Sequence, residues 1–396
     1  MAQYKQVNAV LNKLMSQYRG GAGDPVDLTG LISLGRDNIN SANFKDGYTH
    51  ELSDMVGKTV FRYLKSSLMF PELSRNEFEW GAMLRKIRIA PNQMKENESV
   101  KIGENGYTPN PYAINKPSFS EKFFTDFDAW SDIVTIPDTL MKTSFHSAEE
   151  YGAFIEAFMD SIGDNFTAHE NLMAKTCLTN WIAEKIKHEN GVIDILAMYN
   201  TEFSTSLTPA QALKTQAFLQ YAGMVIRNVI KYLHNDNTIY NVDGSVNNTP
   251  DEEMLVYMLS DFVSAYNTYL LNGVSIFQNE LINLPNYREV ESWQVSGTWA
   301  GGTFPTFDGN SKIVMVPSDG GDPINQEGII GIIADRRGIG TTSTDIYVTT
   351  DRYNGARYTN YTYGATNQYI NDLSEQGVVL IMDGSASRSK TTKSTK

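Results

Sequence analysis

The residues best suited to chemistry in this chain are few, and their spacing matches no known catalytic motif. His169 and Glu170 stand side by side in a segment with helical periodicity, but Met173 replaces the second histidine that a zinc-protease HExxH motif requires. Cys177 falls on the apolar face of the same segment, where a cysteine usually behaves as a small buried hydrophobe. We therefore expect these positions to be structural.

Phosphate-binding and metal-binding patterns are also incomplete. The glycine-rich stretches GGAGDP and RRGIGTT lack the lysine and the strand-to-helix context of a phosphate cradle. Asp319 and Asp322 are too few ligands for a calcium loop, and Asp126 and Asp128 share a strand face in the manner of solvated acids. The sequence predicts no catalytic site, no metal site and no cofactor, with an unrecognised hydrolase as a remaining alternative.

Composition narrows the class further. The chain has 396 residues, of which 41% are hydrophobic, and a formal net charge of −13. An acidic surface repels nucleic acid, which disfavours a sequence-reading DNA-binding protein. Its one cysteine excludes an internal disulfide and fits a reducing compartment. The apolar runs fall short of the roughly 20 residues of a membrane span, so we expect no membrane association.

Two segments carry apolar faces that need an external surface to pack against. In the first, Tyr4, Val7, Leu11 and Leu14 recur at helical spacing, and such a short helix is marginal alone. Its support is either the core of the same chain or a neighbouring chain.

The second such segment has the pattern of a long hairpin. Residues 78–90 and 119–130 alternate apolar and polar side chains and are joined by a long polar connection. Phe119, Phe123 and Phe127 share one face of the returning strand. An isolated two-stranded hairpin is marginally stable in water, and its exposed aromatic face favours association. We therefore expect it to lie on a neighbouring copy, which indicates a protein whose function is assembly.

The charges of this predicted hairpin leave two possibilities open. Arg85, Lys86 and Arg88 on the outgoing strand oppose the acids Glu121, Asp126 and Asp128 on the returning strand. They pair either across the hairpin or with another copy of the chain.

The remaining segments predict an α+β fold. The pattern favours a long helix over 147–188, a helix over 208–233, buried strands at 254–259, 312–317, 328–334 and 377–382, and a tyrosine-rich strand region over 346–370. A polar insertion at 236–250 has no evident partner. The long helix argues against a mostly β adhesin or tail-fibre module.

This order of elements resembles the major capsid proteins of tailed bacteriophages of the Hong Kong 97 type. The stretches NELINLPNYREVESW, GIIGIIADRRGIGTT and DRYNGARYTNYTYGATNQYIN are most similar to capsid proteins of short-tailed phages that infect Gram-positive hosts. The resemblance implies a shell protein that encloses a double-stranded DNA genome. An encapsulin-like nanocompartment shell, which has the same fold, is the main alternative.

The resemblance also implies a division of the chain. It consists of an N-terminal arm (1–45), an extended E-loop (76–137), a peripheral domain with a long spine helix (46–75, 138–205 and 344–376), an axial domain (206–343 and 377–383) and a disordered tail (384–396).

Inter-subunit contacts and partners follow from the same resemblance. The expected contact residues are Arg85, Lys86, Arg88, Lys95, Glu98, Lys101, Glu104, Phe119, Phe123 and Phe127 in the E-loop, Arg352 and Arg357 in the peripheral domain, and Tyr4, Val7, Leu11 and Leu14 in the arm. The expected partners are further copies in pentamers and hexamers, a separate scaffolding protein, the portal and other head proteins, and packaged DNA that is not read by sequence. The expected location is the virion, after assembly in the bacterial cytoplasm.

Overall fold

The computed structural model describes residues 69–74, 84–90, 112, 114, 116, 118–125, 127–137, 148–270, 284–293, 307–318, 320–353 and 355–384. Several predicted features lie outside these residues. They are the N-terminal helix with Tyr4, Val7, Leu11 and Leu14, the loop residues Lys95, Glu98, Lys101 and Glu104, and the tail beyond 384.

The described elements alternate between helix and strand along the chain. The strands are β1 Leu84–Ala90, β2 Ser118–Phe124, β3 Phe127–Pro137, β4 Val192–Asp194, β5 Met254–Leu259, β6 Tyr287–Val290, β7 Ile313–Met315, β8 Ile324–Gln326, β9 Ile329–Asp335, β10 Ile339–Tyr353, β11 Tyr358–Asn371 and β12 Gly377–Ile381. The helices are α5 Ala148–Lys187, α6 Ile195–Glu202, α7 Pro209–Ala212, α8 Gln216–His234, α9 Ser260–Leu270 and α10 Phe307–Asn310, with 3-10 turns η1 Pro71–Leu73 and η3 Arg336–Gly338.

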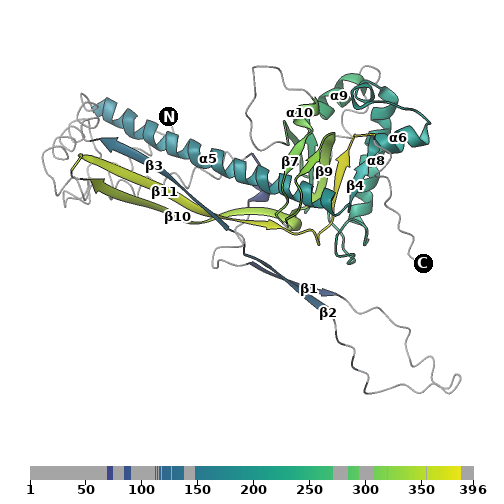
Figure 1. Cartoon of the computed structure of the whole chain (residues 1–396), viewed down its shortest axis with the longest axis horizontal. Coiled ribbons are helices and arrows are strands. Elements are labelled where there is room, and N and C mark those ends of the chain that lie inside the picture. Colours follow the sequence, from purple (N-terminus) through teal and green to yellow (C-terminus); the bar gives the residue numbers. More distant parts are fainter. Residues whose placement is uncertain are drawn as a thin grey trace.

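One end of the molecule is a globular lobe around a five-stranded sheet of order β4-β12-β9-β5-β6 (Figure 1). Its central strands β5, β9 and β12 are buried along their whole length, as their nearly continuous apolar sequences require. Helices α6, α8 and α9 lie in the same lobe. The predicted buried strands at 254–259, 328–334 and 377–382 are confirmed.

The other end is an elongated plate, formed by α5 lying along the three-stranded sheet β10-β11-β3 (Figure 1). Helix α5 has 40 residues, which corresponds to roughly 60 Å at about 1.5 Å per residue. Its carboxyl-terminal part enters the lobe, where Trp181 is 1% exposed and its ring covers Gly377 so closely that a Cβ there would lie 2.3 Å from it. The helix therefore joins the plate to the lobe.

The hairpin β1–β2 projects from the junction of lobe and plate (Figure 1). Its two strands pair with each other in antiparallel register and belong to no larger sheet. The described part of the hairpin is therefore an arm rather than part of a layered core.

Four predicted elements need correction. The strand predicted over 119–130 is two strands, because β2 ends at Phe124 and β3 then pairs with β11. Phe127 thus begins the plate sheet, and 127–137 belongs with the plate rather than with the hairpin. The helix predicted over 208–233 is broken between α7 and α8, although the Thr208–Gln211 capping box is present.

The strand predicted over 312–317 is much shorter than expected. It is reduced to β7, in which only Ile313 is buried, whereas Val314 and Val316 are exposed. The tyrosine-rich strand region starts earlier than predicted, at Ile339, where β10 leaves the turn η3. A short apolar run alone does not distinguish a core strand from an edge ribbon, which explains why the strand at 312–317 was predicted to be longer and more buried than it is.

Candidate assembly surface

The hairpin has two chemically different faces, because its side chains alternate along each strand. In β1, positions 85, 87 and 89 are exposed whereas 86 and 88 are partly buried, and in β2 positions 119, 121 and 123 are exposed. Cross-strand partners lie on the same side of a ladder, so Arg85 faces out with Phe123 and Ile89 with Phe119. We call the side that bears Arg85, Ile87, Ile89, Phe119, Glu121 and Phe123 the outer face.

The outer face is an unusually apolar surface for a free strand pair. Ile87, Ile89, Phe119 and Phe123 are each more than half exposed, and Ile89 lies directly opposite Phe119. Single exposed apolar residues are ordinary, but a contiguous group of them marks an interaction surface. This geometry agrees with the apolar face that the sequence predicts for Phe119 and Phe123.

One ion pair lies on the outer face. Arg85 Nη2 donates to Glu121 Oε1 at 2.5 Å, and the guanidinium lies 5.8 Å from the centre of the Phe123 ring. The cross-strand pairing predicted for Arg85 is therefore present. Because Arg85 is half exposed, the pair contributes little to stability by itself.

The opposite face, which we call the inner face, bears Lys86, Arg88 and Lys122. Among the described residues of the hairpin, none forms an ion pair with these three side chains. Lys86 and Lys122 both donate to Asp372, and Arg88 donates to Glu375, two acids at the end of the plate sheet. The inner face is therefore bound to the chain's own body, so that only the outer face is open.

The far tip of the plate carries a second exposed group. Tyr353 and Tyr358 stack with their ring centres 5.4 Å apart, and Tyr353 is more than half exposed. Arg352 lies on the strand beside them, and Arg357 occupies the turn with a φ of 53°. The two predicted contact residues of the plate are thus placed at its end, beside paired aromatic rings.

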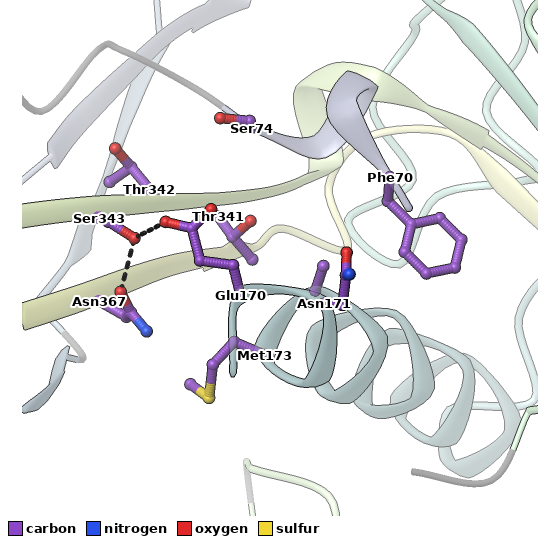
Figure 2. Close-up of a pocket in the computed structure, with 10 residues that line it drawn as sticks. Phe70, Ser74, Glu170, Asn171, Met173, Thr341, Thr342, Ser343 and Asn367 are labelled. Carbon is purple, nitrogen blue, oxygen red and sulfur yellow. Dashed lines mark hydrogen bonds between the residues drawn. The ribbon is translucent and has the colours of Figure 1, made fainter. Parts of the chain in front are cut away.

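Figure 2 shows the small cavity where α5, η1 and the plate sheet meet. Ser343 Oγ lies 2.6 Å from Glu170 Oε1 and 2.7 Å from Asn367 Oδ1, so the hydroxyl links the helix to both long strands. The space has room for little more than a water molecule. Glu170 therefore joins helix and sheet, and the cavity is far smaller than ordinary substrate pockets.

His169 and Cys177 both pack between α5 and the strands. The His169 ring lies 4.1 Å from the centre of Trp130, and burial lowers the pKa of His169 against the opposing charge of Asp128. Cys177 is buried, with its Sγ 3.5 Å from the carbonyl oxygen of Ile370. The packing role predicted for Cys177 is confirmed.

Two kinds of arrangement are absent from the described residues. Within them, no group of three or more His, Cys, Asp or Glu side chains is arranged to hold a metal ion. Among the described helices, none combines the length and the apolarity needed to cross a membrane.

Comparison with protein families shows the family of this chain. The family model of the Phi29-like phage major capsid protein matches residues 7–381. The chain belongs to this family. The comparison with curated proteins found no significant match.

Solved phage structures share the fold of this capsid protein. A chain of the capsid structure of Staphylococcus phage Andhra has a TM-score of 0.52 and 8% identity, over 81% of this chain and 86% of that chain. A chain in the structure of the head fiber and inner core protein gp22 of native bacteriophage P68 has a TM-score of 0.50 and 9% identity, over 80% and 84% of the two chains. At such low identity these matches establish the fold alone.

The resemblance drawn from the sequence is therefore confirmed. The protein is a major capsid protein that assembles from many copies into the head shell of a bacteriophage, and its role is structural. Neither the encapsulin-like shell nor the hydrolase is favoured.

Sequence patterns did not reveal which acidic residues of the body bind the cations of the inner face. Asp372 and Glu375 lie in the stretch NDLSEQG between β11 and β12, and Asp243 lies in the polar insertion. The only local signal was a pair of acids in a turn beside a buried strand. Their partners in β1 and β2 are distant in sequence, so no spacing rule could join them.

Proposed function

We propose that the hairpin is an inter-subunit arm of the head shell and that its outer face packs on a neighbouring copy. The observation that carries this proposal is the difference between its faces, since the inner face is bound to the body and the outer face is apolar and exposed. Burying a Phe side chain fully contributes roughly 1.5–3 kcal/mol, so even a small contact through Phe119 and Phe123 is favourable. Shells obtain their total stability from many such modest contacts.

The parts of the structure are proposed to take the domain roles that the sequence resemblance implies. The bounds differ in one respect, because β4 and α6, which fall within the predicted peripheral segment 138–205, lie in the lobe (Figure 1). In this proposal the hairpin is the base of the E-loop and the intervening residues 91–117 are its distal part. Helix α5 and the plate sheet form the peripheral domain, and the lobe forms the axial domain around five-fold and six-fold centres, in pentamers and hexamers. The continuity of α5 and the fully buried central strands β5, β9 and β12 of the lobe support this division.

The tip of the plate is proposed as a second contact between copies. Arg352, Arg357 and the Tyr353–Tyr358 stack form its end. Tyrosine and arginine are enriched in the centres of protein interfaces, which supports a role in shell contacts.

Further partners follow from the head-shell role. A separate scaffolding protein, the portal, other head proteins and packaged DNA are proposed to contact the shell during assembly in the host cytoplasm. The formal charge of −13 supports an inner wall that faces DNA without reading its sequence. The N-terminal residues Tyr4, Val7, Leu11 and Leu14 and the loop residues Lys95, Glu98, Lys101 and Glu104 are proposed as additional contacts.

The outer-face proposal is tested with the double variant Ile89→Ser/Phe119→Ser. Expressed together with the other head proteins, the wild-type chain is expected to give uniform closed shells in negative-stain images, and the double variant is expected to sediment as unassembled subunits. The matched control is Val314→Ser/Val316→Ser, which removes two equally exposed apolar side chains from the lobe. Wild-type shells from the hairpin variant would remove the proposal, as would an equal loss of shells in the control.

A further inference from the structure

We propose that Asp243, Asp372 and Glu375 form an acidic seat that fixes the direction of the hairpin for assembly, with Asp372 as its central positioning residue. The seat assigns a partner to the polar insertion 236–250, namely the chain's own hairpin. The inference rests on the proposed inter-subunit role of the hairpin, and it adds how the arm is held at a defined angle before it meets a neighbour.

The first observation is a like-charge pair across the hairpin. Lys86 and Lys122 are direct cross-strand partners and share the inner face. Two ammonium groups directly opposite each other destabilise a strand pair unless an acid lies between them. Asp372 supplies that acid, because Lys86 Nζ donates to its Oδ2 at 2.6 Å and Lys122 Nζ donates to its Oδ1 at 3.2 Å. The carboxylate of Asp372 therefore binds one lysine from each strand of the hairpin.

The second acid of the seat extends the contact along β1. Glu375 lies 2.6 Å from Lys86 Nζ and 3.3 Å from Arg88 Nη2. Arg88 Nη1 also donates to Ser245 Oγ at 2.7 Å and to the carbonyl oxygen of Ser374 at 3.1 Å. The guanidinium is thus held from several directions, which restricts rotation of the hairpin on the body.

The body orients the acids of the seat independently of the hairpin. Ser374 donates to Asp372 Oδ1 through both its backbone nitrogen, at 3.0 Å, and its hydroxyl, at 2.6 Å. Asn247 Nδ2 donates to Glu375 Oε2. Hydrogen bonds within the body therefore orient both carboxylates, which can then bind the cations of the hairpin.

Burial of Asp372 and Glu375 makes it unfavourable for the hairpin to separate from the seat. The side chain of Asp372 is fully buried and that of Glu375 almost so, whereas the hairpin cations remain partly exposed. Burial alone would raise the pKa of Asp372, but the charge and hydrogen bond of Lys86, with smaller contributions from Ser374 and Lys122, hold that pKa well below its usual range. Without the hairpin, two buried carboxylates would lose their ion pairs with Lys86, Arg88 and Lys122, which is strongly unfavourable.

The polar insertion forms the outer wall of the seat. Asp243 Oδ2 lies 3.1 Å from Lys122 Nζ. The insertion is attached to the same turn by backbone hydrogen bonds from Val242 to Leu373 and from Gly377 to Tyr240. The insertion and the turn are therefore attached to each other and to the lobe. Their contacts with the hairpin set its orientation relative to the lobe.

The test compares two neighbouring cations that lie on opposite faces of β1. Lys86→Met removes a contact with the seat, whereas the control Arg85→Met removes an outward charge from the adjacent residue. Asp372→Asn, a substitution of the same size, removes the central charge. Hydrogen exchange of the unassembled, full-length protein is followed in peptides that cover β1 and β2, with peptides of β5 and β9 as the internal reference.

The expected result is exchange in β1 and β2 that is faster by roughly tenfold or more in Lys86→Met and Asp372→Asn, with wild-type exchange in Arg85→Met and in the lobe. The effects of the two seat variants are expected to be non-additive when combined, because each removes the same pair. Exchange in β1 and β2 that stays at the wild-type rate in both seat variants would overturn the seat.

A second readout measures assembly with the other head proteins. The seat variants are expected to give fewer shells with a broader range of diameters, whereas Arg85→Met gives wild-type diameters. Faster exchange combined with wild-type shells would overturn the positioning role. Because exchange is measured before assembly, it reports on the seat even where Ile89→Ser/Phe119→Ser assembles normally and the outer-face proposal fails.

Discussion

The lobe sheet and the hairpin are both made of apolar-rich strands, but they are completed in different ways. In the lobe, β5 and β9 are buried at every position, and both faces are covered by the same chain. In the hairpin, one face rests on the acidic seat and the other presents Ile87, Ile89, Phe119 and Phe123 to solvent. The chain itself covers the apolar side chains of the lobe strands, whereas the apolar side chains on the outer face of the hairpin stay exposed in the subunit.

If the outer face packs on a neighbouring copy as proposed, this difference separates the residues that fold the subunit from those that assemble the shell. Continuous apolar burial stabilises the lobe whether or not another copy is present. A two-stranded hairpin is marginal by itself, and its described contacts with the body are mainly ionic and polar. Substitutions in the two regions should therefore affect different measurements.

The largest expected effect is a cavity in the lobe. Ile333 is fully buried in β9, so Ile333→Ala should lower the free energy of unfolding by about 2–5 kcal/mol. Urea unfolding followed by circular dichroism measures this loss. The matched control is Ile87→Ala on the outer face, where a change below about 0.5 kcal/mol is expected. Equal losses at the two positions would contradict the contrast between lobe and hairpin.

The next effect concerns a buried charge where α5 enters the lobe. Lys185 is fully buried and donates to the carbonyl oxygen of Tyr240 at 2.8 Å. Burial lowers its pKa to about 7, against the opposing attraction of Asp372. The unfolded chain therefore binds more protons than the folded chain above pH 7, and this group makes the subunit more stable as pH rises from 7 towards 10.

The expected increase is at most about 1.4 kcal/mol per pH unit, measured by urea unfolding at pH 7, 8 and 9. Lys185→Met should remove this increase. If the variant keeps the same pH slope as the wild type, the increase comes from another group.

A smaller effect is expected in the plate. Because burial lowers the pKa of His169, the folded state favours the neutral ring, and stability should be lost as pH falls through its ordinary value of about 6.5. The loss should be local, since the ring packs against Trp130 and α5. Hydrogen-exchange protection factors of peptides from β3, which correct for the intrinsic exchange rate at pH 5 and 7, measure this loss, and His169→Gln should abolish the difference in protection. A difference that persists in this variant would assign the acid response elsewhere.

The smallest effect on the subunit is expected for Phe119→Ala. Its ring is 67% exposed, so the free energy of unfolding of the unassembled protein should change by less than about 0.5 kcal/mol. The same substitution at Phe218, which is fully buried in α8, should cost about 3–5 kcal/mol. Shell yield should fall for Phe119→Ala even though the subunit is as stable as the wild type. A large loss of subunit stability at Phe119 would mean that this ring packs within its own chain.

Much of the fold could be predicted because its signals are local. The run Met254–Leu259 is apolar at each position and becomes a buried strand, and the period of the segment after residue 147 becomes a single long helix. The alternation of apolar side chains also predicted that Phe119 and Phe123 share a face. The break between β2 and β3 was missed because the alternating pattern continues across it while the pairing partner changes from β1 to β11.

The sequence by itself determined that this chain folds a mixed α+β core and carries an apolar arm, because the spacing of apolar residues within a segment indicates which of its faces is apolar. Only the tertiary structure decided which face of the arm is free, because that depends on pairs such as Lys86 and Asp372, which are 286 residues apart. An ion pair leaves no periodic trace in either segment, and Lys86 looks equally suited to a cross-strand partner, a neighbouring copy or solvent. The fold brings the cations of the inner face to buried acids, and this leaves the apolar side chains of the outer face exposed.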